Sequence, residues 1–128
     1  MEKEFVPYEL AVKLKELGFD EPCFGRYGEI DNLEFRFFKE PKSFNYGLTS
    51  KTCLAPTFSQ AFRFFREKYK LKSWIEVYIE GRNNYIYEIR PHKSDDYKEG
   101  EVYVFETHEE TELACLTKLI EIVESKSE

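Results

Sequence analysis

Residues 54–79 read LAPTFSQAFRFFREKYKLKSWIEVYI, and this stretch decides the fold because it joins the clearest helix of the chain to its clearest strand. Thr57 and Gln60 have the spacing of a capping box behind Pro56, which marks the N-terminus of a helix. Apolar side chains then recur at helical spacing on one face: Phe58, Ala61, Phe62, Phe65 and Tyr69. That face is expected to be buried in a core.

After Lys70 the apolar period changes from that of a helix to that of a strand, which residues 74–79 are predicted to form. The pattern places two sets of side chains on opposite faces: Trp74, Glu76 and Tyr78 on one, and Ile75, Val77 and Ile79 on the other. Because only the second face lacks charge, we expect the helix after Thr57 and the C-terminal helix to cover it.

Two further helices are predicted at the ends of the chain. The first spans residues 7–17, where Pro7 suits the first turn and Gly18 suits the position after the last. The last opens with a capping box of Thr107 and Glu110 and runs from about residue 108 to residue 124. Its apolar positions cover about half the circumference: Leu113, Cys115, Leu116, Leu119, Ile120, Ile122 and Val123.

Short strands are predicted at residues 24–30, 33–38, 85–89 and 101–105, with a turn at Gly81-Arg82-Asn83-Asn84. Residues 39–53 and 90–100 are rich in turn-forming types, although alternation of Phe44, Tyr46 and Leu48 leaves an edge strand open there. The prediction is an α+β fold with an antiparallel sheet of about four to five strands and three helices, in the order α-β-β-α-β-β-β-α.

A chain of 128 residues with 41% hydrophobic content has the size of one ordinary domain, so a single domain is expected over residues 1–128. The formal net charge of -6 argues against broad nucleic-acid binding. Cys23, Cys53 and Cys115 are widely separated and form no disulfide framework. The acidic N-terminus and the lack of a long apolar run predict a cytoplasmic protein with no membrane partner.

Catalytic motifs do not emerge from the sequence. The run HEETE from His108 has Glu112 where a zinc-protease helix needs its second histidine, and neither a P-loop nor a dinucleotide-binding glycine pattern is present. His92, Asp95 and Asp96 are close enough in sequence to ligate a divalent metal, but adjacent aspartates in such a loop are typical of a solvated surface. We therefore predict no catalytic residues, no metal site and no cofactor.

A basic face is the main candidate for ligand binding. Arg63, Arg66 and Lys70 are spaced three and four residues apart, on the side of the helix away from its apolar stripe. Together with further cationic and aromatic side chains, this face could hold an anionic nucleotide. The additional candidates are Arg82, Arg90 and Tyr78. The alternative is a plain solvated face, since Glu67 lies beside it.

The broad apolar surface of the last helix also suggests self-association. One sheet face and the first helix can cover only part of that arc, which leaves Cys115, Leu119 or Ile122 near solvent. A two-fold contact that makes a homodimer would bury them. The alternative is that the helix lies between the sheet and the first helix, where the same residues are covered within one chain.

Three segments carry a family resemblance: FVPYELAVKLKELGFDEPCFG (5–25), LAPTFSQAFRFFREKYKL (54–71) and ETHEETELACLTKLIEIVES (106–125). Together they resemble a family of small, largely uncharacterised proteins encoded by phages, prophages and mobile elements of gut Bacteroidales. The chain departs from the family pattern at Phe64, where relatives tend to carry tryptophan, and at His108, where they tend to carry tyrosine. The resemblance implies the setting of a phage accessory gene in the host cytoplasm, without transferable site residues.

These observations leave two main classes of function. The first is a non-enzymatic accessory protein that binds a host protein, such as a defence or regulatory component. The second is a sponge that binds a small nucleotide signal at the basic and aromatic face, and an enzyme acting on such a nucleotide is the least expected. A pocket lined by arginines and aromatic rings favours nucleotide binding, whereas a flat apolar patch favours a protein partner.

Overall fold

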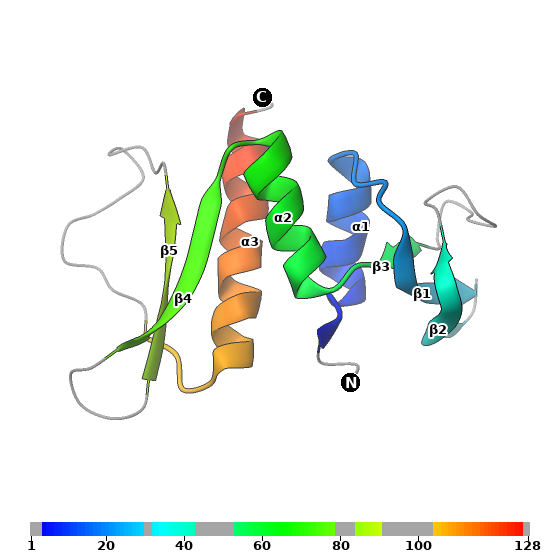
Figure 1. The fold of residues 1–128 in the computed structure, drawn as a ribbon, viewed down its shortest axis with the longest axis horizontal. Coiled ribbons are helices and arrows are strands. Elements are labelled where there is room, and N and C mark those ends of the chain that lie inside the picture. The colour runs from blue at the N-terminus through cyan, green and yellow to red at the C-terminus, as the bar shows by residue number, and fades with distance from the viewer. Residues whose placement is uncertain (1–3, 30–31, 43–52, 79–83, 91–103, 127–128) are drawn as a thin grey trace. The chain divides into compact units, whose positions relative to one another are not determined.

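The computed structural model describes residues 4–29, 32–42, 53–78, 84–90 and 104–126 (Figure 1). The elements follow in the order α1 (Tyr8–Glu16), β1 (Cys23–Glu29), β2 (Asn32–Lys42), β3 (Cys53–Ala55), α2 (Phe58–Lys68), β4 (Lys72–Tyr78), β5 (Asn84–Arg90) and α3 (His108–Lys126). The chain divides into two compact units, Met1–Ala61 and Phe62–Glu128. The fold is α+β, and the number of independently folding domains stays a prediction.

In the first unit, α1 ends as its sequence predicts. Gly18 has a φ of 97°, and the amide of Phe19 donates to the carbonyl of Leu14 over 2.9 Å while that of Gly18 donates to Lys15 over 3.1 Å. This is a Schellman ending, in which a left-handed residue lets the chain satisfy the last helical carbonyls. Phe19 and Leu14 are both buried, so the helix end is also fixed by an apolar contact.

The sheet of this unit has the strand order β2-β1-β3, with antiparallel pairing throughout. β3 was not predicted, because its three residues are all buried and are too few to show a period. It pairs Gly25 with Ala55 and contacts α1. The hydroxyl of Tyr27 donates to the carbonyl of Val6 over 2.8 Å, which joins β1 to the segment that leads into α1.

The capping box that opens α2 is formed as predicted. The amide of Gln60 donates to Thr57 Oγ1 over 3.1 Å, and the amide of Thr57 donates to Gln60 Oε1 over 3.0 Å. The amide group of the Gln60 side chain also donates to the carbonyl of Pro22 over 2.9 Å. α2 ends at Lys68, and two residues later the exposed Lys70 has a φ of 59°. The buried Leu71 follows it.

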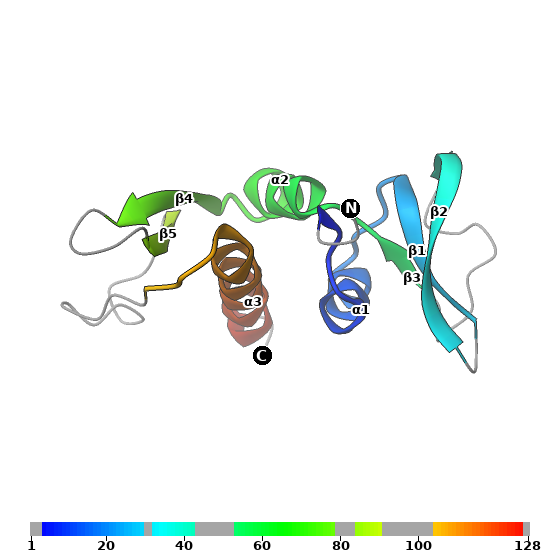
Figure 2. The same cartoon turned by 90° about the horizontal axis from the view of Figure 1, so that it is seen from below.

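In the second unit, α3 packs against the antiparallel pair β4 and β5 (Figure 2). The described residues therefore form two separate sheets in place of the predicted single sheet of four to five strands. Phe105 forms an isolated antiparallel bridge with Tyr85, so part of the predicted third strand of this sheet is present. Residues 101–103 of that predicted strand lie outside the described residues. So do residues 43–52 and 91–100, which make up most of the two predicted loops.

The faces of β4 alternate as predicted, but helices cover the uncharged face only in part. Ile75 is half-buried and pairs with Tyr87, while Glu76 is exposed. Val77 is 57% exposed, so its predicted burial was wrong, and Ile79 lies outside the described residues. The physical reason is that α3 contacts β4 along a limited length and leaves the end of the strand uncovered.

Candidate functional site

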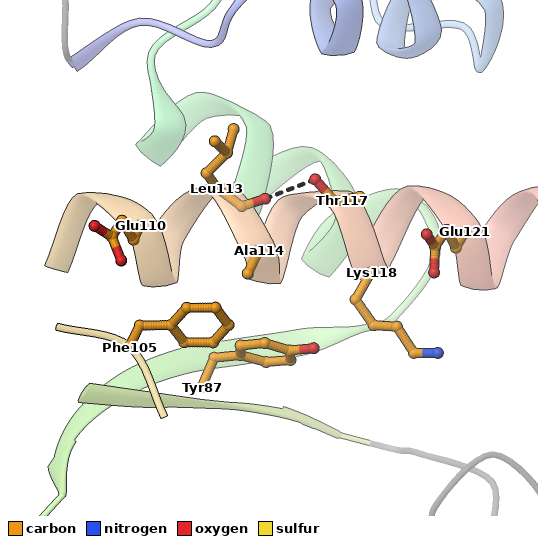
Figure 3. A pocket seen from close by; sticks show the side chains of 8 residues that line it. All are labelled: Tyr87, Phe105, Glu110, Leu113, Ala114, Thr117, Lys118 and Glu121. Carbon is orange, nitrogen blue, oxygen red and sulfur yellow. Dashed lines mark hydrogen bonds between the residues drawn. The ribbon is translucent and has the colours of Figure 1, made fainter. Parts of the chain in front are cut away.

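The candidate site is a groove of about 590 Å³ between α3 and β5 (Figure 3). Its aromatic side is formed by Tyr87 and Phe105, whose rings stack with centroids 6.3 Å apart and an interplanar angle of 26°. Ala114 and Lys118 point from α3 toward these rings, whereas Leu113 lies on the opposite side of the helix. The groove is open to solvent and mostly apolar.

Backbone pairing holds the aromatic side in place. The amide of Tyr85 donates to the carbonyl of Phe105 over 2.8 Å, and the amide of Phe105 donates back over 2.9 Å. Directly opposed residues of an antiparallel pair project to the same face, and side chains two positions along lie on that face as well. The bridge therefore places Phe105 diagonally from Tyr87, where the two rings can stack.

The helix side of the groove is set by the start of α3. The amide of Glu110 donates to Thr107 Oγ1 over 3.1 Å, and the hydroxyl of Thr111 donates to the carbonyl of Thr107 over 2.7 Å. Leu113 follows one turn into the helix and is 40% exposed. The hydroxyl of Thr117 donates to the carbonyl of Leu113 over 2.8 Å, so it is satisfied within the helix.

The groove has an acidic border. Glu110 and Glu121 line it from two turns of α3 and are exposed, and Lys118 is the basic residue of the lining. The chain as a whole carries a formal net charge of -6. An apolar surface bordered by carboxylates is complementary to an apolar segment flanked by basic residues.

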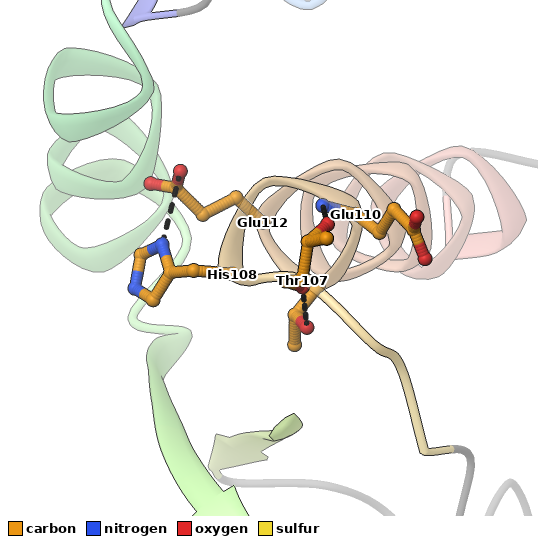
Figure 4. A network of polar contacts seen from close by, with 5 residues as sticks. Thr107, His108, Glu110 and Glu112 are labelled. Carbon is orange, nitrogen blue, oxygen red and sulfur yellow. Dashed lines mark hydrogen bonds and ion pairs between the residues drawn. The ribbon is translucent and has the colours of Figure 1, made fainter. Parts of the chain in front are cut away.

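A smaller pocket of about 190 Å³ is lined by Cys115, Ser73, Trp74, Ile75, Phe62, His108 and Glu112. His108 Nδ1 lies 3.3 Å from Glu112 Oε1 one turn along α3 (Figure 4). A histidine, a carboxylate and a thiol are also the three groups that make up the active site of many cysteine enzymes, in which the thiol is the nucleophile. Here the pKa of the Cys115 thiol is raised to about 12, mainly by burial; a hydrogen bond with Ser73 opposes the rise and the carboxylate of Glu112 adds to it. The thiol is therefore held protonated, which is the opposite of activation.

The described residues of the predicted basic face lie on three elements or their ends, and the face stays a prediction. Arg63, Arg66 and Lys70 are all exposed. Arg90 is exposed on β5, where its Nη1 lies 2.8 Å from Glu88 Oε2 and donates to the carbonyl of Ile89 over 3.1 Å. Tyr78 is half-buried at the end of β4, and Arg82 lies outside the described residues. Among the described residues, neither pocket lining contains an arginine.

The residues predicted for self-association are already covered. Cys115 and Leu119 are fully buried and Ile122 is 8% exposed, so they offer no apolar surface to a second copy. The exposed apolar residue of α3 is Leu113, from the same predicted stripe.

The groove residues were not singled out from sequence. The available signals were the alternation of residues 85–89 and the position of Leu113 at the border of a wide apolar arc.

Comparison with models of protein families, with curated proteins and with solved structures gave no match. Membership of the phage-encoded family therefore stays a hypothesis that rests on the three quoted segments. Among the described residues, no group of three or more His, Cys, Asp or Glu side chains is arranged to hold a metal ion, and His92, Asp95 and Asp96 lie outside that part of the chain. No helix in the described ranges is long and apolar enough to cross a membrane.

Proposed function

We propose that this chain is a non-enzymatic binding protein whose α3–β5 groove holds a short apolar segment of a protein partner. The observation that carries the proposal is the stacked pair of Tyr87 and Phe105, which faces Ala114 of α3 across a groove of about 590 Å³ (Figure 3). Rigid aromatic side chains in a concave apolar surface are the usual anchors of protein recognition. The groove is concave, not the flat patch expected for a protein partner, but its mostly apolar lining without arginine supports a protein segment over an anionic nucleotide.

The charge of the groove specifies the chemistry of the partner segment. Glu110 and Glu121 border the apolar surface, and Glu109 adds charge at the start of α3. A partner segment with one or two large apolar side chains between lysines or arginines would place its cations beside these carboxylates. The resemblance to phage-encoded proteins supports a partner from the host cell, such as a component of defence or regulation.

The test is selection of displayed peptides from the host's proteins on the purified chain. Ala114→Glu is the disrupting variant, because Ala114 points from α3 toward the aromatic rings and the change puts a carboxylate between them and the helix. Phe24→Glu is the matched control, because Phe24 is exposed, at 47%, and lies in the first unit. Peptides enriched on the wild type and on Phe24→Glu, lost on Ala114→Glu, and basic around an apolar centre would support the proposal. Equal enrichment on all three proteins would contradict it.

The second candidate is a sponge for an anionic nucleotide, which the exposure of Arg63, Arg66 and Lys70 favours. Replacing Arg63 and Arg66 with glutamate should leave the fold intact, because both side chains project into solvent. Isothermal titration with a panel of mono- and cyclic dinucleotides then separates the two functions. Binding that the double variant abolishes would assign the nucleotide site to this face, whereas peptide selection should be unaffected by the change.

A further inference from the structure

Within the ranges that the structure describes, the strand β4 presents an open backbone edge. β4 pairs with β5 along its whole length, from Lys72 opposite Arg90 to Tyr78 opposite Asn84. On its other side, β5 forms the bridge between Tyr85 and Phe105. Among the described residues, β4 thus has a strand neighbour on one side only. Its exposed side chains include Trp74 at 45%. An exposed edge strand of this length is a ready template for another strand.

We propose that the occupant of this edge is a second copy of the same chain, paired antiparallel, β4 to β4, about a two-fold axis at Trp74. In that register Trp74 lies opposite Trp74 of the partner subunit. Lys72 then lies opposite Glu76 of the partner subunit, and the symmetry repeats the pair on the other side of the axis. One contact therefore makes two ion pairs and one aromatic pair.

The sequence of β4 is self-complementary in this register. Lys72 and Glu76 are equidistant from Trp74 and are both exposed, on the face that also carries the indole. Opposite charges directly across an antiparallel pair are stabilising, like charges are destabilising, and aromatic pairs add to the contact. A partner strand of unrelated sequence would match this pattern only by coincidence, whereas a second copy supplies it by symmetry.

The proposed dimer is independent of the groove. It uses the edge and the exposed face of β4, whereas the groove is formed by α3, Phe105 and the Tyr87 side of β5. It also replaces the two-fold contact expected at α3, whose residues Leu119 and Ile122 are buried within one chain. Failure of either proposal leaves the other in place.

The test combines sedimentation velocity with intrinsic fluorescence over a range of protein concentrations. Trp74 is the one tryptophan of the chain, so its emission reports the proposed interface directly. A single strand pair buries a small area and is expected to give a weak dimer, so the protein concentration should extend to about 0.5 mM. We expect a monomer–dimer equilibrium in which the emission of Trp74 shifts to shorter wavelength, and acrylamide quenching falls, as the dimer forms.

Charge variants test the register. Glu76→Lys and Lys72→Glu each turn both ion pairs into repulsions, so each should raise the dissociation constant by about tenfold or more. The double variant Lys72→Glu with Glu76→Lys restores opposite charges and should recover the dimer. Glu67→Lys is the matched control, because Glu67 is an exposed carboxylate on α2. Circular dichroism confirms that each variant is folded.

Two results would overturn the proposal. One is a monomer throughout the concentration range, with the emission and quenching of Trp74 unchanged. The other is a dimer that tolerates both single charge reversals, or one that the double variant fails to restore, since either would place the contact on another surface.

Discussion

The ring of Tyr87 stacks on the ring of Phe105, with centroids 6.3 Å apart, although one residue lies within β5 and the other precedes α3. Paired backbone amides at Tyr85 and Phe105 bring the two segments together. The stack gives the groove its flat aromatic side and ties the start of α3 to the sheet. It is therefore both a candidate recognition surface and a tertiary contact.

The first prediction is that Tyr87 and Phe105 are energetically coupled. In a double-mutant cycle with Tyr87→Ala and Phe105→Ala, the coupling should be about 0.5–1.5 kcal/mol, as for other aromatic pairs. The measurement is urea unfolding of the wild type, both single variants and the double variant. Strictly additive losses of stability would show that the two rings do not stack in solution.

The second prediction contrasts two leucines of α3. Leu116 is fully buried, so Leu116→Ala should lower the free energy of unfolding by about 2–5 kcal/mol through lost packing and the cavity left behind. Leu113 is 40% exposed, so Leu113→Ala should change it by no more than about 0.5 kcal/mol. Chemical denaturation compares the two variants directly. Similar costs at both positions would contradict the observed orientation of the helix.

The third prediction concerns the capping box of α2. Thr57→Ala removes the hydroxyl that accepts from the Gln60 amide over 3.1 Å and should cost about 1 kcal/mol of stability. Thr57→Ser keeps that acceptor and should retain most of the stability. Ser59→Ala, at an exposed position in the same turn, is the control and should have little effect. Thermal unfolding followed by circular dichroism is sufficient to rank the three variants.

The fourth prediction is a loss of stability in alkaline solution. Burial raises the pKa of Cys115 from its ordinary value of 9.0 to about 12, and that of Cys23 by a similar amount, while that of Cys53 rises to about 11. Above pH 9 the unfolded thiols release protons that the folded thiols retain. Stability is therefore complete below pH 9 and falls as the pH rises toward 12, by about 1.4 kcal/mol per pH unit for each thiol.

Urea unfolding at a series of pH values checks this slope, with Cys115→Ala as the comparison. The variant lacks one of the three buried thiols, so its stability should fall less steeply between pH 9 and 11 than that of the wild type. The difference between the two slopes isolates the contribution of the Cys115 thiol, because every other residue is the same in both proteins. Parallel curves would mean that Cys115 is accessible to solvent.

Local signals in the sequence were reliable where neighbouring residues decide the outcome. The capping box of Thr57 and Gln60 and the left-handed Gly18 both have the predicted roles. Such features depend on residues within one or two turns, so they survive any change in tertiary context. Lys70 shows the limit of this rule, because a lysine there adopts the φ of 59° that glycine favours.

The candidate site was harder to predict because it depends on contacts between distant segments. Tyr87 and Phe105 are 18 positions apart in the sequence, and nothing in either segment specifies that they meet. Arg63 and Arg66 were correctly placed on an exposed face, but Arg90 lies beside Glu88 and not in an arginine-lined pocket. Exposure alone did not identify a binding site.

By itself, the sequence determined where the helices begin and end, the alternation of side chains along most of β4, and the α+β class, because helical and strand periods are properties of consecutive residues. Only the tertiary structure decided that β3 joins β1, and that the strands form two sheets. It also decided that the side chain of Leu113 is exposed to solvent while that of Leu119 is buried, although both lie on α3. The physical reason is that burial depends on which segment packs against a face, and this is settled by contacts across the chain.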